Sequence, residues 1–269
     1  MQDLTGGIAS LFHANGVKWL RGSGQLQPER QVRFTSHDGS VQMLDAQNII
    51  LATGSAPMDI HAAPLHGDRI VDSSGALNWT QTPQRLGIIG AGVIGLELGS
   101  VWSRLGAEVV LLEALDTFLP AADKQISRTA FGSFKQQGLD IRLNARLLST
   151  EVKQKKVHVT YEDTRGAQQI KFDKLIVAVG RRPNTNHLAS DEARLLLDEW
   201  GLVHVDEQCR TNLPGVYAIG DVTGRAALTP VAAAPALGWS RAAAARRTGR
   251  PGDGARRRPP GGYTRRRAR

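Results

Sequence analysis

The sequence has 269 residues, enough for two ordinary domains, and its hydrophobic content of 41% is typical of a globular protein. The net charge of +9 comes from one end of the chain. Residues 231–269 contain eleven Arg and one acidic residue, a net +10, whereas residues 1–230 together carry −1. The single cysteine, Cys209, excludes an intramolecular disulfide and a multi-cysteine metal site, and it favours a cytoplasmic location.

The start of the chain shows neither a signal sequence nor a membrane span. Residues 1–12 lack a basic start followed by a continuous apolar core. No apolar run in the sequence reaches the roughly 18 residues that a spanning helix needs. We therefore expect a soluble protein without a membrane partner.

The first part of the chain combines a helix, a meander and a connection. Residues 1–16 have the apolar spacing of a helix that ends at an Asn-Gly pair. Residues 17–44 alternate apolar and polar side chains between turn signals, which predicts an antiparallel meander. A buried strand is expected over residues 48–53. Residues 56–84 are rich in Pro, Gly, His and Ser, and are interpreted as a connection between domains.

From residue 85 onward, strands and helices alternate, which indicates a parallel sheet. The expected elements are strands at 85–89, 108–113, 140–143, 174–179, 202–205 and 216–220, helices at about 96–106 and 123–137, and a second meander at 147–173. We therefore predict an α/β fold with three layers and antiparallel meanders, in which one domain interrupts another. The boundaries are 1–83, 84–185, 186–233 and a basic, disordered tail at 234–269, which lacks apolar periodicity.

A glycine-rich loop follows the strand at residues 85–89. In the string GAGVIG, Gly90 allows a tight turn, Gly92 lets a pyrophosphate approach the backbone, and Gly95 lets the following helix pack closely on the strand. Val93 and Ile94 complete the loop before the helix, whose free N–H groups and positive dipole favour a phosphate. The strand, loop and helix together predict a Rossmann-like dinucleotide site.

Two acidic residues accompany the loop. Glu113 ends the next strand, 18 residues after Gly95, where a carboxylate accepts hydrogen bonds from the adenosine ribose and repels a 2′-phosphate. This position favours NAD over NADP, although Glu113 could instead cap the end of a solvated strand. Glu97 is expected in the first turn of the helix, where the dipole stabilises a carboxylate whether or not it has a function.

Three further strings, each placed after an expected strand, strengthen the assignment: Ala-Thr-Gly at 52–54, Val-Gly-Arg-Arg-Pro-Asn at 179–184 and Val-Tyr-Ala-Ile-Gly-Asp at 216–221. Their order around the glycine loop resembles the pyridine nucleotide-disulfide oxidoreductases. The strings GGIASLF, NIILATGSAP and DKLIVAVGRRPNT look most like the dihydrolipoamide dehydrogenase branch. The resemblance covers about residues 1–230, and implies FAD and NAD as cofactors, with the NAD-binding domain inserted in a partial FAD-binding domain.

The resemblance also implies roles for individual residues. Asp221 would bind a ribityl hydroxyl of FAD, and Thr53 and Gly54 would lie against the flavin nucleotide. Gly180 would lie beside NAD and Glu97 near the nicotinamide. Independently of the family, Asp221 follows an expected strand and a glycine, where open α/β sheets bind ligands, although it could instead cap a helix.

The sequence also departs from the family. We expect it to be a fragment, because the family's FAD-binding glycine loop, its Cys-x-x-x-x-Cys redox pair and its C-terminal dimerisation domain with a catalytic His are missing. Cys209 is interpreted as an ordinary small residue, and the His187–Glu192 spacing as a coincidence. No catalytic or metal site is assigned. The segment after Asp221 resembles the glutathione reductase branch. Beyond Ala233 nothing matches, and we hypothesise a shifted or artificial reading frame there.

The leading functional hypothesis is an FAD- and NAD-dependent oxidoreductase of the dihydrolipoyl dehydrogenase type, inactive as this truncated chain. The alternatives are a non-catalytic NAD-binding module and a member similar to glutathione reductase. The family implies a 2-oxo acid dehydrogenase complex as partner, and a homodimer in relatives that have the dimerisation domain. Nucleic acid could bind the eleven Arg of the tail through its phosphates, but it is not expected as a biological partner.

Overall fold

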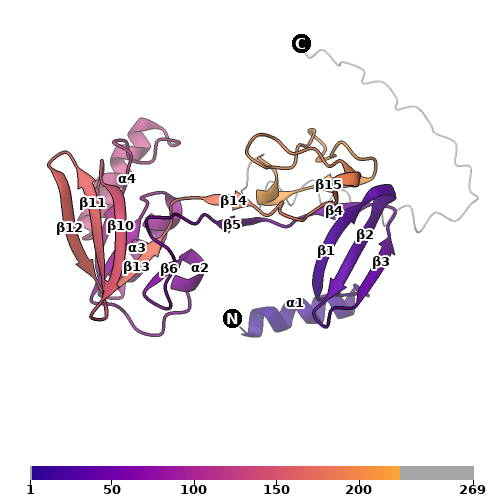
Figure 1. Ribbon diagram of the computed structural model, residues 1–269, viewed down its shortest axis with the longest axis horizontal. Helices are drawn as coiled ribbons and strands as arrows, with labels where there is room; N and C mark the ends of the chain where they lie inside the picture. The colour runs from indigo at the N-terminus through magenta and orange to yellow at the C-terminus, as the bar shows by residue number, and fades with distance from the viewer. Residues whose placement is uncertain (1, 225–269) are drawn as a thin grey trace, which may run out of the picture.

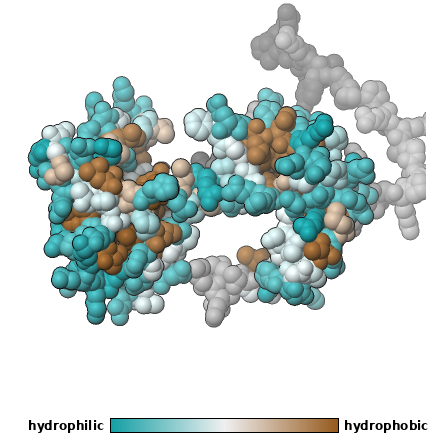
Figure 2. Space-filling model, in the orientation of Figure 1, coloured by the Kyte–Doolittle hydropathy of each residue, from teal (hydrophilic) through white to brown (hydrophobic). Residues whose placement is uncertain are grey.

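The computed structural model describes residues 2–224 and shows two lobes joined by a narrow two-stranded ribbon (Figure 1). The space-filling view shows the lobes as separate bodies (Figure 2). One lobe holds the glycine loop, and the other holds the N-terminal helix and the first meander. The expectation of a disordered tail at 234–269 lies outside the described residues.

The glycine-loop lobe is built on a five-stranded, all-parallel sheet with the order β6-β13-β7-β8-β9. Its strands are β6 (Ile70–Asp72), β7 (Arg85–Ile89), β8 (Glu108–Leu112), β9 (Asp140–Arg142) and β13 (Lys174–Val177). Three helices accompany it: α2 (Ser73–Ala76), α3 (Val93–Arg104) and α4 (Lys124–Gln136). The antiparallel meander β10-β11-β12 completes this lobe, with β10 (Arg146–Lys153), β11 (Lys156–Asp163) and β12 (Gly166–Phe172).

Both faces of the parallel sheet are buried, so this lobe has three layers. Successive side chains of a strand point to opposite faces. Leu111 of β8 accordingly belongs to a cluster with Leu96 and Trp102 of α3, and Leu112 belongs to a second cluster with Phe172 and Tyr161 of the meander. The continuous apolar sequence of β8 is therefore the pattern of a strand covered on both sides. The three-layer α/β fold with antiparallel meanders is confirmed.

The second lobe contains less regular structure. Its elements are α1 (Gln2–Ala14), the meander β1 (Gly22–Gln27), β2 (Gln31–Ser36) and β3 (Val41–Asp45), the parallel pair β4 (Ile49–Leu51) and β15 (Val216–Ala218), and the 3-10 turns η1 (Pro28–Arg30), η2 (Asp191–Ala193) and η3 (Gly220–Val222). Its core is a third cluster, which includes Leu26, Leu51, Val203 and Ala218.

Two antiparallel strands form the ribbon between the lobes. They are β5 (Ser55–Pro57) and β14 (Arg181–Pro183), and they pair with Ser55 opposite Pro183. The chain enters the glycine-loop lobe along β5 and leaves it along β14 (Figure 1). Residues far apart in sequence, before and after this lobe, are thereby held side by side.

Two expectations differ from the structure. The stretch 56–84, interpreted as a connection, contains β6, which pairs with β13 at the edge of the parallel sheet. The stretch 202–205, expected as a strand, forms only an isolated bridge between Val203 and Leu197. Within residues 2–224, no helix combines the length and the apolar character that crossing a membrane requires.

Candidate nucleotide site

The glycine loop lies where three neighbouring strands end. The loop follows β7 in the middle of the sheet, Glu113 follows β8 on one side, and the segment ending at Gly180 follows β13 on the other. Because the strands are parallel, their carboxyl ends meet at one edge of the sheet. That edge is where open α/β sheets bind ligands.

Gly90 and Gly95 are required by the packing of the protein itself. Gly90 has a φ of +99°, and a Cβ there would lie 2.5 Å from the carbonyl oxygen of Ala178. A Cβ on Gly95 would lie 2.1 Å from the carbonyl oxygen of Gly90. These glycines let α3 sit directly against the turn that leaves β7, and that contact aims the start of the helix at the cavity.

Gly92 differs from its two neighbours in the motif. Its φ of −73° is open to any residue, and a Cβ there would meet no atom of the protein within 4 Å. It is the N-cap of α3 and has no side chain to satisfy the first N–H groups of the helix. Neither backbone strain nor internal packing explains this glycine, whereas a ligand resting on the loop would.

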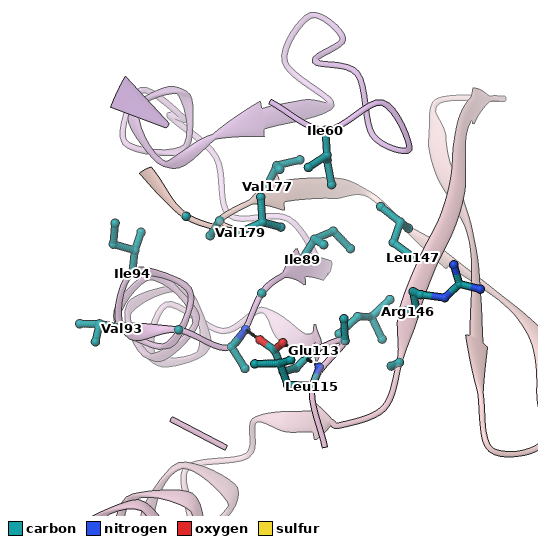
Figure 3. Close-up of a pocket in the computed structure, with 18 of the residues that line it drawn as sticks. Ile60, Ile89, Val93, Ile94, Glu113, Leu115, Arg146, Leu147, Val177 and Val179 are labelled. Carbon is teal, nitrogen blue, oxygen red and sulfur yellow. Dashed lines mark hydrogen bonds between the residues drawn. The ribbon is translucent and has the colours of Figure 1, made fainter. Parts of the chain in front are cut away.

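The Glu113 carboxylate is hydrogen-bonded to the backbone of the glycine loop. Its Oε2 accepts the N–H of Ala91 at 2.8 Å and its Oε1 accepts the N–H of Leu115 at 3.0 Å (Figure 3). A carboxylate has about four acceptor positions. Glu113 can therefore hold the loop and still accept hydrogen bonds from a hydroxyl in the cavity.

The loop, Glu113 and Gly180 surround a cavity of about 760 Å³, a volume within the range of small-molecule sites. The expected site residues that line it are Gly90, Gly92, Val93, Ile94, Glu113 and Gly180. Val93 and Ile94 come from α3, Val177 is the last residue of β13, and Val179 follows that strand (Figure 3). Gly95 shapes the cavity from outside it, through its contact with Gly90.

Sequence reasoning missed the other walls of the cavity. Ile60, in the stretch interpreted as a connection, lies on one side of the cavity and Leu147 of β10 on another (Figure 3). His61, next to Ile60 in the sequence, and Arg181, at the start of β14, also line it. Arg181 belongs to the string at 179–184, from which no role is predicted for it. These residues follow no local pattern, and only the fold brings them to the glycine loop.

Glu97 does not line the cavity, and its expected place in the first helical turn was wrong. Because Gly92 is the N-cap, α3 begins at Val93, and Glu97 is its fifth residue, with an exposed side chain. The first turn therefore holds no acidic residue.

Thr53, Gly54 and Asp221 also lie away from this cavity, beyond the carboxyl ends of β4 and β15 in the other lobe. Thr53 donates its hydroxyl to the carbonyl of Asn184 at 2.9 Å, and the Asn184 amide donates to the carbonyl of Thr53 at 3.0 Å. Asp221 accepts the hydroxyl of Ser55 at 2.7 Å. Its place in η3 is a 3-10 turn without a side-chain cap, not the N-cap of an α-helix.

The two groups of expected cofactor-binding residues differ in how far the described residues surround them. The cavity at the glycine loop has a helix N-terminus, an acceptor for hydroxyls and an open position at Gly92, which together fit a dinucleotide such as NAD. On the flavin side, Asp221, Thr53 and Gly54 stand at the end of a sheet of only two strands, β4 and β15. Within residues 2–224, this edge is thus formed by two strands, whereas the glycine loop lies at the edge of a five-stranded sheet.

No cluster of three or more His, Cys, Asp or Glu residues that could hold a metal is found within residues 2–224. Cys209 is a half-buried free thiol with a φ of +59°. Glu192 is exposed, and its own backbone N–H and the Ser190 hydroxyl lower the pKa of its carboxyl.

The model of the family described as "Pyridine nucleotide-disulphide oxidoreductase" matches residues 1–236. The chain belongs to this family. Among curated pyridine nucleotide-disulphide oxidoreductases, it is 41% identical over 220 residues to the dihydrolipoyl dehydrogenase of Cupriavidus necator, covering 81% of this chain and 46% of that protein. It is also 41% identical over 226 residues to the mitochondrial dihydrolipoyl dehydrogenase of Bos taurus, covering 82% and 44%.

Solved structures are also similar to this chain. LpdA from Mycobacterium tuberculosis matches with a TM-score of 0.80 and 27% identity, over 90% of this chain and 54% of that one. The HOCl-induced flavoprotein disulfide reductase RclA from Escherichia coli matches with a TM-score of 0.71 and 29% identity, over 80% and 48%. The chain thus spans about half the length of the relatives it matches, within a family of FAD-dependent enzymes that use NAD or NADP.

Proposed function

We propose that the cavity at the glycine loop binds NAD(H), and that the chain is the pyridine-nucleotide part of an FAD- and NAD-dependent oxidoreductase of the dihydrolipoyl dehydrogenase type. The observation that carries this proposal is Gly92, which is open to the cavity at the N-terminus of α3. The first N–H groups of α3 would hold the pyrophosphate. When bound, NAD supplies the hydride acceptor.

Glu113 would select the cofactor. Its carboxylate would accept the hydroxyls of the adenosine ribose and repel the 2′-phosphate of NADP. Gly180, with a φ of +145°, would let the chain pass close beside the ligand. We therefore expect NADH to bind more tightly than NADPH.

The flavin half of the proposal depends on residues beyond those described. Asp221 would accept a ribityl hydroxyl of FAD, with Thr53 and Gly54 against its nucleotide, once further strands complete the β4–β15 sheet. The similarity to dihydrolipoyl dehydrogenases supports dihydrolipoamide and NAD as substrates of the complete enzyme, with a homodimer in a 2-oxo acid dehydrogenase complex as its setting. The single cysteine of the sequence supports a cytoplasmic location.

The second candidate is an NAD-binding module without catalysis. It is favoured by the difference between the two sites: the residues that line the nucleotide cavity all lie between Pro57 and Arg181, whereas the flavin site is partial within the described residues. The chain has one cysteine, and the transfer of two electrons from a dithiol to flavin in this family uses a cysteine pair. We therefore propose that this chain alone oxidises dihydrolipoamide negligibly.

The binding proposal is tested by titrating the 269-residue chain with NADH, followed by NADH fluorescence. A Val side chain at position 92 would project into the space left for the pyrophosphate, so Gly92→Val should weaken NADH binding at least tenfold with little change in thermal stability. The matched control is Gly132→Ala on α4, at another open glycine, which should leave NADH affinity unchanged. The proposal is contradicted if the wild-type chain does not bind NADH at millimolar concentration. It is also contradicted if the Gly92→Val variant binds NADH with wild-type affinity.

The catalytic question is decided separately. The same preparation, with FAD added, is assayed for NADH formation from dihydrolipoamide and NAD. The expected rate equals that of free flavin. Turnover clearly above that rate would refute the non-catalytic alternative and show that the chain needs no cysteine pair of its own.

A further inference from the structure

A chain of hydrogen bonds runs from the nucleotide cavity to the opposite lobe. Arg181, which lines the cavity, donates from Nε to the Ser55 hydroxyl at 2.7 Å and from Nη2 to the Ser55 carbonyl at 2.6 Å. The same Ser55 hydroxyl donates to Asp221 Oδ2 at 2.7 Å. The three residues come from β14, β5 and η3, so the chain crosses between the lobes at the ribbon.

The donors and acceptors of these hydrogen bonds follow from the chemistry of the three groups. A hydroxyl carries one hydrogen and two lone pairs. Because Ser55 gives its hydrogen to the carboxylate of Asp221, a lone pair is left to accept Arg181 Nε. The hydroxyl thus joins a cation on the ribbon, Arg181, to an anion in the lobe that holds η3, Asp221. Each charge strengthens the other's hydrogen bond to Ser55.

The order of the sheet indicates which part of a dinucleotide Arg181 would meet. Glu113 follows β8 on one side of β7, and Arg181 follows β13 on the other. A dinucleotide whose adenosine ribose lies at Glu113 and whose pyrophosphate lies at the glycine loop must extend toward β13. Arg181 is therefore at the nicotinamide end, and the guanidinium has five N–H donors, of which the two bonds to Ser55 use two.

We propose that Ser55 and Asp221 are positioning residues that hold Arg181 at the nicotinamide end of the NAD cavity. Asp221 thereby serves both lobes: it fixes Ser55, and it is the residue proposed to bind flavin. This inference rests on the proposed binding of NAD(H).

The experiment measures NADH affinity in the 269-residue chain by fluorescence titration. Loss of one hydrogen bond of about 1 kcal/mol corresponds to about fivefold in affinity, so Ser55→Ala and Asp221→Ala should each weaken NADH binding about three- to tenfold. Ser55→Thr and Asp221→Asn keep a hydroxyl and an acceptor, and should restore most of the affinity. Arg182→Gln, an exposed neighbour on the same strand, is the charge-matched control and should have no effect.

A double-mutant cycle separates positioning from general damage. In an Arg181→Gln background, Asp221→Ala and Ser55→Ala should change NADH affinity less than twofold, because the group that they position is gone. Equal losses in both backgrounds, or no loss from Asp221→Ala in the wild-type background, would overturn the inference. Either result leaves the NADH proposal intact, since that proposal fails only if the wild-type chain does not bind NADH or if Gly92→Val binds it normally.

Discussion

Gly92 and Gly95 stand three residues apart in one motif, yet they are glycine for different reasons. At Gly95 a side chain would collide with the carbonyl oxygen of Gly90, so the protein's own packing forbids one. At Gly92 a side chain would enter open space. A substitution at Gly95 therefore tests folding, and one at Gly92 tests binding.

Asp173 illustrates a residue whose charge holds two layers together. It lies between β12 and β13, where Oδ2 accepts the backbone N–H of Arg85 at 2.9 Å and Oδ1 pairs with Lys156. Burial by itself raises the pKa of Asp173, but the Lys156 ammonium and the Arg85 N–H stabilise the carboxylate more strongly. The pKa therefore lies below its ordinary value.

From this lowered pKa we predict a pH-dependent loss of stability in Asp173→Asn. A carboxyl whose pKa is lower in the folded state stabilises fully above its unfolded pKa of about 4, and the effect is lost as the pH falls through the folded value. The variant should lose about 1–3 kcal/mol at pH 7, and this deficit should shrink as the pH falls below about 4, where the unfolded carboxyl takes up its proton. Urea unfolding at both pH values measures this. Glu207→Gln, at an exposed residue, is the control, and a deficit that persists unchanged at low pH would contradict the prediction.

At the scale of elements, the meander β10-β11-β12 packs on the parallel sheet through a close fit at Gly87. A Cβ on Gly87 of β7 would lie 2.6 Å from the Phe172 ring and 2.7 Å from Leu175. Phe172 is fully buried at this point. The absence of a side chain on β7 is therefore what lets the end of β12 reach the sheet.

We predict opposite effects from alanine at two glycines of this lobe. Gly87→Ala should destabilise by about 1–3 kcal/mol, because its methyl group overlaps Phe172 in a filled core. Gly132→Ala, inside α4 with nothing within 4 Å, should stabilise by about 0.5–1 kcal/mol, because alanine loses less backbone freedom in a helix. Denaturant unfolding of both variants checks the pair. A neutral Gly87→Ala would mean that the meander does not press on β7 as described.

The elements that the sequence could predict are those with a local signal. The strand, turn and helix around Gly90 follow from residue types at fixed spacing, and β8 follows from its apolar run. By contrast, β6 has three residues in a Pro- and Gly-rich stretch, and becomes a strand because β13 lies beside it. The apolar alternation around Val203 predicted a strand, but its neighbourhood provides a single bridge.

The same distinction applies to the site. The glycines and Glu113 could be predicted because one supersecondary unit places them. The contact between Ser55 and Asp221 joins residues 166 positions apart, and that between Ser55 and Arg181 joins residues 126 apart. Such contacts depend on how the two lobes meet, and no spacing within one segment encodes them.

On the scale of the whole molecule, the cores are separate. Two apolar clusters fill the faces of the parallel sheet in one lobe, and the third, around Leu26 and Ala218, lies in the other. The lobes are joined by β5 and β14 (Figure 1). Few core contacts therefore couple the unfolding of one lobe to that of the other.

We predict that the chain unfolds in two calorimetric transitions. NADH should raise the midpoint temperature of only one of them. A ligand at 100 times its dissociation constant stabilises the unit that binds it by about 2.7 kcal/mol. The midpoint temperature of the glycine-loop lobe should rise, and that of the other lobe should not change. Amide hydrogen exchange with and without NADH assigns each transition, with protection expected in β7 and β8 and none gained in β1–β3. One transition that moves as a whole would show that the ribbon couples the lobes fully.

The pairing of β5 with β14 has a consequence for how such a protein can be rebuilt. Because Ser55 and Pro183 are neighbours across the ribbon, the two ends of the glycine-loop lobe are about 5 Å apart. A segment whose ends nearly touch can be lifted out of one host and grafted into a surface turn of another without stretching either backbone. The glycine-loop lobe could therefore be inserted as a unit into another protein. That protein would need only a hairpin at the position that β5 and β14 occupy here.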